Sequence, residues 1–246
     1  AKVRFAPRLD FGRSVTTLRP VADGLEVEGW YDPIVLRSPG VTWQVMQEGP
    51  HHTAEAEIDL SFGPVTLELR YGTASMLSAP AKEAIRREQS RRFWSGWAAT
   101  LRNTTMHAAL VRRSALALKA LVHGPTGAIA AAATTSLPEH LGGVRNWDYR
   151  YCWVRDACLA ASSLVRLGNT GVGLKLLDWM APVVAACESP DRLRPLYTVS
   201  GERLGPEAEI SEAGGYGGSR PVRIGNAASQ QVQLDVFGPV VELVAL

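Results

Sequence analysis

The chain has 246 residues, of which 46% are hydrophobic and 20% charged, enough to bury one large core or two smaller ones. Its 26 lysines and arginines are scattered among 24 aspartates and glutamates, for a formal net charge of +2, so the basic stripe of a nucleic-acid-binding protein is missing. No apolar run is long enough to cross a bilayer. We therefore expect a soluble globular protein whose partners include neither nucleic acid nor a membrane.

The cysteines and histidines argue against disulfides and metals. Three cysteines, Cys152, Cys158 and Cys187, are too few and too odd in number for a disulfide framework, which favours a reducing, cytoplasmic location. No C-x-x-C pair is present, and the histidines stand apart except for His51-His52, so we predict no metal and no cofactor. The N-terminus does not read as a signal peptide and lacks an initiator Met, so we expect upstream residues to be missing.

Residues 1–80 read as a partial antiparallel β-sandwich. Apolar and polar side chains alternate with a period of two in four runs, which are 25–30, 41–46, 56–60 and 65–69. Turn-forming pairs such as Asp23-Gly24 and Gly63-Pro64 separate the runs. We place a domain boundary near residue 80.

Residues 81–107 are expected to form a linker helix region. A charged stretch, Lys82 to Glu88, leads into the aromatic run Phe93-Trp94-Ser95-Gly96-Trp97. The aromatic side chains are expected to dock on a neighbouring layer.

Residues 108–246 carry the spacing of helices. One helix is predicted through Val111 to Val122, stopping at Gly124-Pro125. A second follows Asp156 and ends at Gly168, and a third spans 171–187 with a kink expected at Pro182. Asn226 is predicted to cap a fourth helix, which Pro239 must bend or break.

The densest chemistry lies in the segment 146–156, which reads Asn-Trp-Asp-Tyr-Arg-Tyr-Cys-Trp-Val-Arg-Asp. Aromatic rings stack on the apolar face of a pyranose, while Asp and Arg bind adjacent hydroxyls, so the composition is typical of a sugar site. Taken singly, Asp156 is more often a helix N-cap and Arg155 an ion-pair partner. Trp147 and Trp153 are likewise more often core residues.

A second cluster is the glycine-rich segment 214–226. Its glycines would allow the backbone to approach a ligand closely. It lacks both the G-x-G-x-x-G pattern after a strand and the Walker lysine, which argues against a nucleotide. The alternative is a flexible loop ahead of a capped helix.

Several of these runs together resemble glycoside hydrolase family 15, which includes glucoamylases and bacterial trehalases. The runs that carry the resemblance are 112–119, 125–128, 134–139, 145–156, 218–228 and 233–236, and 11–14 resembles the N-terminal β-domain of the family. The resemblance implies a β-sandwich followed by the first helices of an (α/α) six-hairpin barrel. It also implies hydrolysis of α-glucosidic bonds from the non-reducing end with inversion, by a general acid and a general base.

The resemblance implies substrate-binding residues but no catalytic ones in this segment. The positions that match the family's subsite for the terminal glucose are Tyr149, Trp153, Arg155, Asp156, Arg220 and Arg223. Fungal members carry a tryptophan just ahead of the Arg-Pro-x-Arg segment, whereas Gly218 and Ser219 stand here, a departure that argues against fungal-type starch-chain binding. Neither catalytic glutamate has a counterpart before Leu246, so both are expected beyond it and the segment alone is expected to be inactive.

Three hypotheses follow for the function. The first is an inverting exo-acting hydrolase whose substrate is an α-glucoside such as trehalose or a maltooligosaccharide. The second is a carbohydrate-binding relic without catalysis, and the third is a structural fragment that cannot fold independently. The sequence reveals neither which α-glucoside is the substrate nor the oligomeric state.

Overall fold

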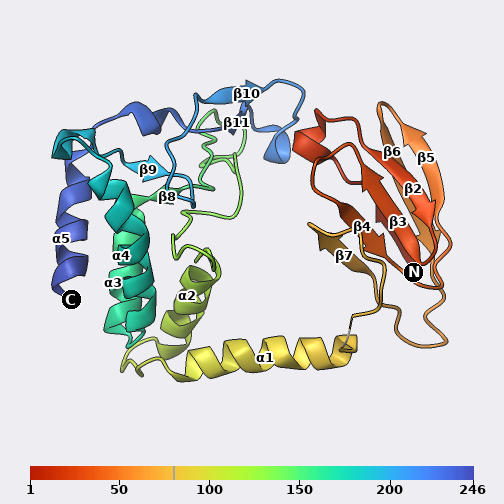
Figure 1. Ribbon diagram of the computed structural model, residues 1–246, viewed down its shortest axis with the longest axis horizontal. Coiled ribbons are helices and arrows are strands. Elements are labelled where there is room, and N and C mark those ends of the chain that lie inside the picture. Colours follow the sequence, from red (N-terminus) through yellow and green to blue (C-terminus); the bar gives the residue numbers. More distant parts are fainter. Residues whose placement is uncertain (80) are drawn as a thin grey trace. The chain divides into compact units, whose positions relative to one another are not determined.

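The computed structural model describes residues 1–79 and 81–246 and divides into two compact units, Ala1–Gln89 and Ser90–Leu246. The first is built mainly of strands and the second of helices joined by long loops (Figure 1). Antiparallel sheets followed by helices are the order that the sequence predicts. Within the described residues, no helix combines the length and the apolar character that a membrane span needs.

The N-terminal unit contains two antiparallel sheets. The three-stranded sheet has the order β1-β6-β5, with β1 at Lys2–Phe5, β6 at His51–Glu57 and β5 at Gln44–Glu48. The four-stranded sheet has the order β2-β3-β4-β7, with β2 at Thr17–Val21, β3 at Gly24–Glu28, β4 at Ile34–Arg37 and β7 at Glu68–Tyr71. The four predicted strand runs overlap β3, β5, β6 and β7, while β1, β2 and β4 were not predicted.

The two sheets share one apolar core. Leu18 and Leu25 from the four-stranded sheet are buried in the same cluster as Ala54 from the three-stranded sheet. His52 of β6 forms hydrogen bonds between the two sheets. Its backbone N–H donates to the Thr16 carbonyl (2.8 Å), and its Nδ1 accepts from the N–H of Leu18 in β2 (3.1 Å). The inward side chains of the two sheets therefore face each other, as in a sandwich.

Helix α1, Glu83–Ala99, lies within residues 81–107, where the sequence predicts a linker helix. The sequence predicted that the aromatic side chains of this helix dock on a neighbouring layer, but only one of the three does so. Phe93 is 59% exposed and Trp94 37% exposed, and the two rings pack edge to face. Trp97, three residues further on, packs on the core of the helical unit. Only the last turn of α1 therefore buries an aromatic side chain.

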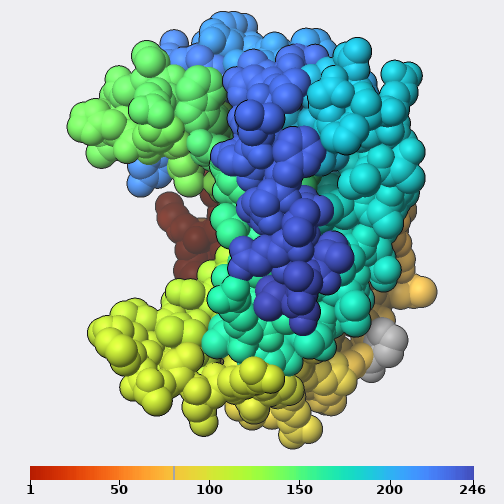
Figure 2. Space-filling model, turned by 90° about the vertical axis from the view of Figure 1, so that its left-hand side faces the viewer, coloured from red at the N-terminus to blue at the C-terminus, as the bar shows by residue number. Residues whose placement is uncertain are grey.

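The core of the helical unit lies between its helices. These are α2 at Ala108–Ala120, α3 at Val154–Arg166, α4 at Thr170–Ala185 and α5 at Phe237–Ala245. Leu164 of α3 and Leu176 of α4 are completely buried in one cluster, and each contributes roughly 1.5–3 kcal/mol by burial. Figure 2 shows α5, in dark blue, on the surface of this unit, where it packs against α3. Leu243 of α5 completes the cluster.

The helix ends correct two sequence predictions. Helix α3 begins at Val154 with Trp153 as its N-cap, so Asp156 is the third helical residue and not a cap. Its end is as predicted, because Gly168 adopts a left-handed φ of 95° and donates to the Val165 carbonyl. Asn226 does not cap α5, because its side chain accepts from the Ala228 N–H and closes a short 3-10 turn, Ala227–Gln230.

Two prolines of this unit, Pro182 and Pro239, lie within helices. Pro239 does not break α5, because it is the third residue of the helix, where backbone N–H groups have no intrahelical partner. Pro182 lies inside α4, which continues to Ala185.

Short strands and turns connect the helices. The strands form two antiparallel pairs, with β8 at Cys152–Trp153 beside β9 at Leu196–Tyr197, and β10 at Ala208–Ile210 beside β11 at Val222–Ile224. Further 3-10 turns of this unit are Pro190–Arg192, Tyr216–Gly218 and Leu234–Val236, and the N-terminal unit has one at Leu9–Gly12, between β1 and β2. The glycine-rich segment is therefore partly ordered, since it holds one of these turns and leads into β11.

Candidate functional site

Strand β8 separates two environments at the start of α3. Cys152 lies opposite Tyr197, and Trp153 lies opposite Leu196. Because successive side chains point to opposite faces of a strand, Cys152 enters the helical core while Trp153 enters a second, smaller apolar cluster. Burial raises the pKa of Cys152 to about 12, which leaves its thiol protonated and inert. Tyr149 packs against the smaller cluster, so this face of β8 carries the aromatic residues predicted to bind a sugar.

Tyr149 and Trp153 form an aromatic corner. Their ring centroids lie 5.4 Å apart at an angle of 54°. Trp153 is buried, whereas Tyr149 is half-buried. Burial, and then the Glu139 carboxylate, raise the pKa of Tyr149, with a smaller contribution from Asp156. At neutral pH the Tyr149 hydroxyl is therefore a hydrogen-bond donor.

Arg155 and Asp156 form an ion pair in the first turn of α3. An Arg155 Nη atom lies 3.1 Å from Asp156 Oδ2, and the other lies 2.6 Å from Oδ2 of Asp235. The side chains of Arg155 and Asp156 are 35% and 48% exposed. The hydrogen bond from Arg155 to Asp235 raises the pKa of the guanidinium. The first turn of α3 thus presents a charged and half-exposed donor and acceptor next to each other.

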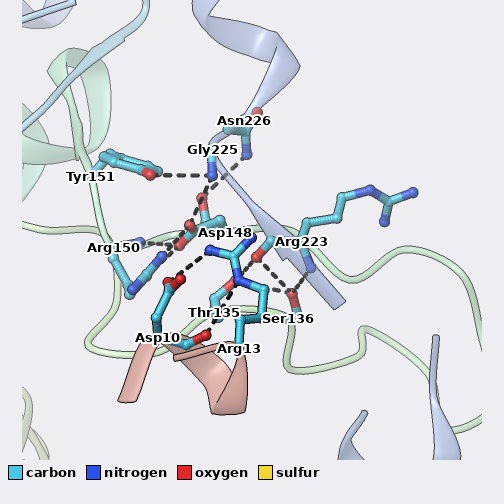
Figure 3. A network of polar contacts seen from close by, with 10 residues as sticks. All are labelled: Asp10, Arg13, Thr135, Ser136, Asp148, Arg150, Tyr151, Arg223, Gly225 and Asn226. Carbon is cyan, nitrogen blue, oxygen red and sulfur yellow. Dashed lines mark hydrogen bonds and ion pairs between the residues drawn. The ribbon is translucent and has the colours of Figure 1, made fainter. Parts of the chain in front are cut away.

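Asp148 is the centre of a buried polar network (Figure 3). Its side chain has no exposed surface, and it accepts two hydrogen bonds from the Arg150 guanidinium, at 2.8 and 2.7 Å. Oδ2 also accepts from the Gly225 N–H (3.2 Å), and the Asp148 carbonyl accepts from Asn226 Nδ2 (3.3 Å). The Tyr151 hydroxyl accepts from the same Gly225 N–H at 3.2 Å. The hydrogen bonds of Asp148 therefore connect segment 220–226 with segment 146–156.

Arg223 strengthens the same connection. Its guanidinium pairs with Glu207 (3.2 Å) and Glu209 (3.4 Å), and its side chain is only 12% exposed. It also lies 4.7 Å from the centre of the Trp147 ring and donates to the Asn146 carbonyl at 3.3 Å.

The backbone of Arg223 also forms hydrogen bonds, with the side chains of residues 135–136. Its N–H donates to Ser136 Oγ (2.7 Å), while its carbonyl accepts from Thr135 Oγ1 (2.6 Å). The contacts of Arg223 therefore hold three parts of the chain together, which are 135–136, 144–147 and 207–209.

The structure brings four of the six predicted residues together and leaves the other two apart from them. Tyr149, Trp153, Arg155 and Asp156 are gathered at β8 and the first turn of α3, and Arg223 reaches the segment just ahead of them through Trp147. Arg220 is exposed, and within the described part of the chain no hydrogen bond or ion pair joins it. The roles of these six side chains toward a substrate stay predictions.

Two residues of the site were not singled out from the sequence. Asp235 orients Arg155 from the turn before α5, and Asp148 connects the two segments. Both lie in runs that carry the family resemblance, 145–156 and 233–236, but the burial and partners of these two side chains depend on the fold. In residues 1–79 and 81–246, no three His, Cys, Asp or Glu side chains gather as a metal site would require.

Comparison with known proteins places the chain in a family. The family model "Glycosyl hydrolases family 15" matches residues 105–246, and the model "Trehalase-like, N-terminal" matches residues 1–94. The chain belongs to glycosyl hydrolase family 15. The resemblance in the sequence is thereby confirmed for more than half of the chain.

Relatives of this family 15 chain carry the name trehalase. The trehalase of Thermoplasma acidophilum is 39% identical over 163 residues, which cover 66% of this chain and 27% of that protein. For the trehalase of Thermoplasma volcanium the identity is 35% over 195 residues, 76% of this chain and 31% of that protein. The trehalase of Mycobacterium tuberculosis is 45% identical over 135 residues, 54% of this chain and 20% of that protein. The matched part thus spans less than a third of each relative, and no solved structure matches the chain.

Proposed function

We propose that this chain is part of an inverting, exo-acting α-glucoside hydrolase that acts on trehalose or short α-glucans, and that it supplies the subsite for the terminal glucose. The observation that carries the proposal is the first turn of α3, where the half-exposed pair Arg155–Asp156 follows directly on the Tyr149–Trp153 corner. The names of the relatives support trehalose in particular. The three cysteines are free thiols, which supports a reducing, cytoplasmic location.

Each group of the proposed subsite has a distinct chemical task. The aromatic corner offers an apolar wall for the C–H face of a pyranose. Asp156 accepts hydrogen bonds from two adjacent hydroxyls of glucose, and Arg155 donates to a neighbouring oxygen while Asp235 fixes its orientation. The Tyr149 hydroxyl, held protonated, supplies a further donor. Exo-acting hydrolysis requires a subsite for the terminal glucose, and these groups are proposed to form it.

The acid and base that inversion needs are proposed to lie outside these 246 residues. An inverting hydrolase places its two carboxyl groups about 6.5–9.5 Å apart on opposite faces of the sugar. The helices α2 to α5 would be the first members of an (α/α) six-hairpin barrel whose later helices carry those groups. Residues 146–156 would then position the glucose, and the remaining helices would hydrolyse its bond.

The proposal is tested by Asp156→Asn in the full-length protein. Asparagine keeps the shape but loses the charge-assisted hydrogen bonds to glucose, so transition-state stabilisation should weaken by about 1.5–3 kcal/mol. The kcat/KM for trehalose or maltose should fall by on the order of tenfold to a hundredfold. The melting temperature should change little, because Asp156 is not the cap of α3.

Asp178→Asn, at an exposed carboxylate of α4, is the matched control and should leave both quantities unchanged. An Asp156→Asn enzyme with normal kcat/KM would remove Asp156 from the subsite. A wild-type protein that hydrolyses neither sugar would contradict the proposed function as a whole.

A further inference from the structure

A pocket of about 410 Å³ lies beside the C-terminal half of α4. Its walls come from α4, from β9 and from the loop that follows β9. They include the apolar side chains of Pro182 and Val183 and the polar side chains of Asp178, Trp179 and Arg203. Small-molecule sites have volumes of about 300–1,000 Å³, so the pocket is large enough for a ligand.

The floor of the pocket carries a hydrogen-bond donor without a partner. Trp179 is 5% exposed, and its buried Nε1–H has no hydrogen-bond partner among the described residues. The backbone of Gly201 lies beside this nitrogen, since an added Cβ would be 3.6 Å from Nε1 and 3.3 Å from Val183 Cγ2. The glycine thus leaves room that a side chain would fill. A buried donor left unpaired is costly, so its place in a pocket wall calls for a ligand that accepts from it.

The mouth of the pocket carries one carboxylate and one guanidinium. Asp178 and Arg203 are both exposed, and within the part of the chain that the structure describes no hydrogen bond or ion pair joins either of them. An anionic ligand would be repelled by Asp178, and a cationic ligand by Arg203. A neutral ligand with hydroxyl groups can use both side chains, because a hydroxyl donates to a carboxylate and accepts from a guanidinium.

The wall between floor and mouth is apolar. Pro182 and Val183 line it, and the rings of Trp179 and Tyr197 pack edge to face with their centroids 6.4 Å apart. A pyranose has C–H groups on its faces and hydroxyls around its edge. An apolar wall between hydrogen-bonding groups therefore matches a sugar ring.

The pocket and the proposed glucose subsite lie on opposite faces of the β8–β9 pair. Tyr197 of β9 lines the pocket and lies opposite Cys152, whereas Leu196 lies opposite Trp153 and packs in the same cluster as Trp153. Successive side chains of a strand point to opposite faces, so the two sites have separate walls. Among the described residues that line the pocket, none belongs to the six predicted for the terminal glucose.

We propose that this pocket is a second, non-catalytic binding site for a neutral monosaccharide. Trp179 Nε1–H and the Arg203 guanidinium donate to hydroxyl oxygens of the sugar, and the Asp178 carboxylate accepts from a hydroxyl. Pro182 and Val183 cover a C–H face of the ring. The proposal does not depend on the proposed function, because it uses other residues on the other face of β8–β9.

The thiol of Cys187 can report whether the pocket is occupied. Cys187 lines the pocket and is partly exposed, whereas Cys152 and Cys158 have no exposed surface. N-ethylmaleimide should therefore alkylate Cys187 in the folded full-length protein and leave the other two thiols unmodified. Mass spectrometry of the peptides measures alkylation at each position, and unmodified Cys152 and Cys158 show that a variant is folded.

Glucose is the probe, and it should slow the alkylation of Cys187 in a saturable way. At about four times the dissociation constant the rate should fall about fivefold, because only empty pockets react. Arg203→Gln removes a charge-assisted hydrogen bond and should raise the glucose concentration for half-protection about tenfold. Trp179→Phe keeps a ring but loses the N–H, and should raise it by about two- to tenfold. Arg192→Gln, at an exposed arginine outside the pocket, is the matched control and should leave it unchanged.

Several results would overturn the proposal. Glucose that does not protect Cys187 is one, and a Cys187 that N-ethylmaleimide cannot reach in the wild-type protein is another, because the pocket would then be covered. Unchanged half-protection in a folded Arg203→Gln protein is a third, and this exposed position decides the matter if Trp179→Phe does not fold. Protection by free glycine or sodium sulfate but not by glucose would assign the pocket to a zwitterion or an anion.

The same readout separates this proposal from the proposed function. Protection of Cys187 should persist in Asp156→Asn, since Asp156 belongs to the other site. Loss of protection in that variant would show that the glucose responsible is bound at the first turn of α3, and would contradict a second site. A full-length protein that hydrolyses no α-glucoside would leave the expected protection unchanged, because alkylation does not require activity.

Discussion

Asp148 and Asp156 stand eight residues apart in one aromatic segment, yet their surroundings are opposite. The Asp148 side chain has no exposed surface and is bound by Arg150 and by the Gly225 N–H. The Asp156 side chain is 48% exposed and pairs with Arg155. A carboxylate whose lone pairs are used inside the protein can hold the backbone, whereas one that faces solvent can bind a ligand. We infer that Asp148 holds the segments of the site together and that Asp156 is the carboxylate that binds the ligand.

Two of the three arginines of the predicted subsite, Arg223 and Arg155, differ in the same way. Arg223 is 12% exposed and makes ion pairs with Glu207 and Glu209, so its guanidinium is largely committed to the protein. Arg155 is 35% exposed and pairs with carboxylates that are themselves about half exposed. A direct sugar contact therefore fits Arg155 better, and Arg223 fits a role in positioning the segments.

Among the substitutions that test this difference, Asp148→Ala should have the largest effect on stability. The change leaves the Arg150 guanidinium without its buried partner, and breaking a buried pair lowers the free energy of unfolding by about 3–5 kcal/mol. Because the Arg150 side chain is 38% exposed, the lower end of that range is expected. Asp156→Ala should lower it by less than about 1 kcal/mol, as for an exposed ion pair. Chemical denaturation of the full-length protein measures both, and equal losses would contradict the assignment of roles.

A smaller effect is expected at Gly225, the backbone partner of Asp148. Gly225 has a φ of 76°, and an added Cβ would lie 3.0 Å from the Pro206 carbonyl oxygen. Gly225→Ala should lower the free energy of unfolding by roughly 1–3 kcal/mol through backbone strain. Gly205→Ala is the matched control, because a Cβ there meets nothing within 4 Å and should change stability by less than about 0.5 kcal/mol. Similar melting temperatures for the two variants would show that the Gly225 conformation does not matter.

The local pattern of the sequence predicted those strands in which apolar and polar residues alternate, and those helix ends that a glycine marks. Strand β3 alternates and was found, whereas β4 was missed because two successive residues, Val35 and Leu36, are both buried. The end of α3 was predicted correctly because a left-handed glycine is a local signal. The start of α5 was predicted wrongly, since the Asn226 side chain caps a short turn before the backbone becomes extended at Gln231.

The sequence indicated which residue types the candidate site contains, but not which of them form hydrogen bonds and ion pairs with one another. Aromatic, arginine and aspartate side chains cluster at 149–156 in the sequence, and the resemblance to the family singled out four residues there as a glucose subsite. Which of the aspartates is buried depends on Gly225, which lies 77 residues from Asp148 along the chain. The same holds for Asp235, which pairs with Arg155 across 80 residues. Such partners follow from tertiary packing, on which local pattern carries no information.

The most direct test of the account is a crystal structure of the full-length protein with bound glucose. We expect a glucose hydroxyl oxygen within roughly 2.5–3.2 Å of the Asp156 carboxylate, with the sugar ring against Tyr149 and Trp153. Asp148 should remain bound to Arg150 and Gly225 and make no contact with the sugar. Glucose bound elsewhere, with Asp156 still paired only to Arg155, would contradict the account.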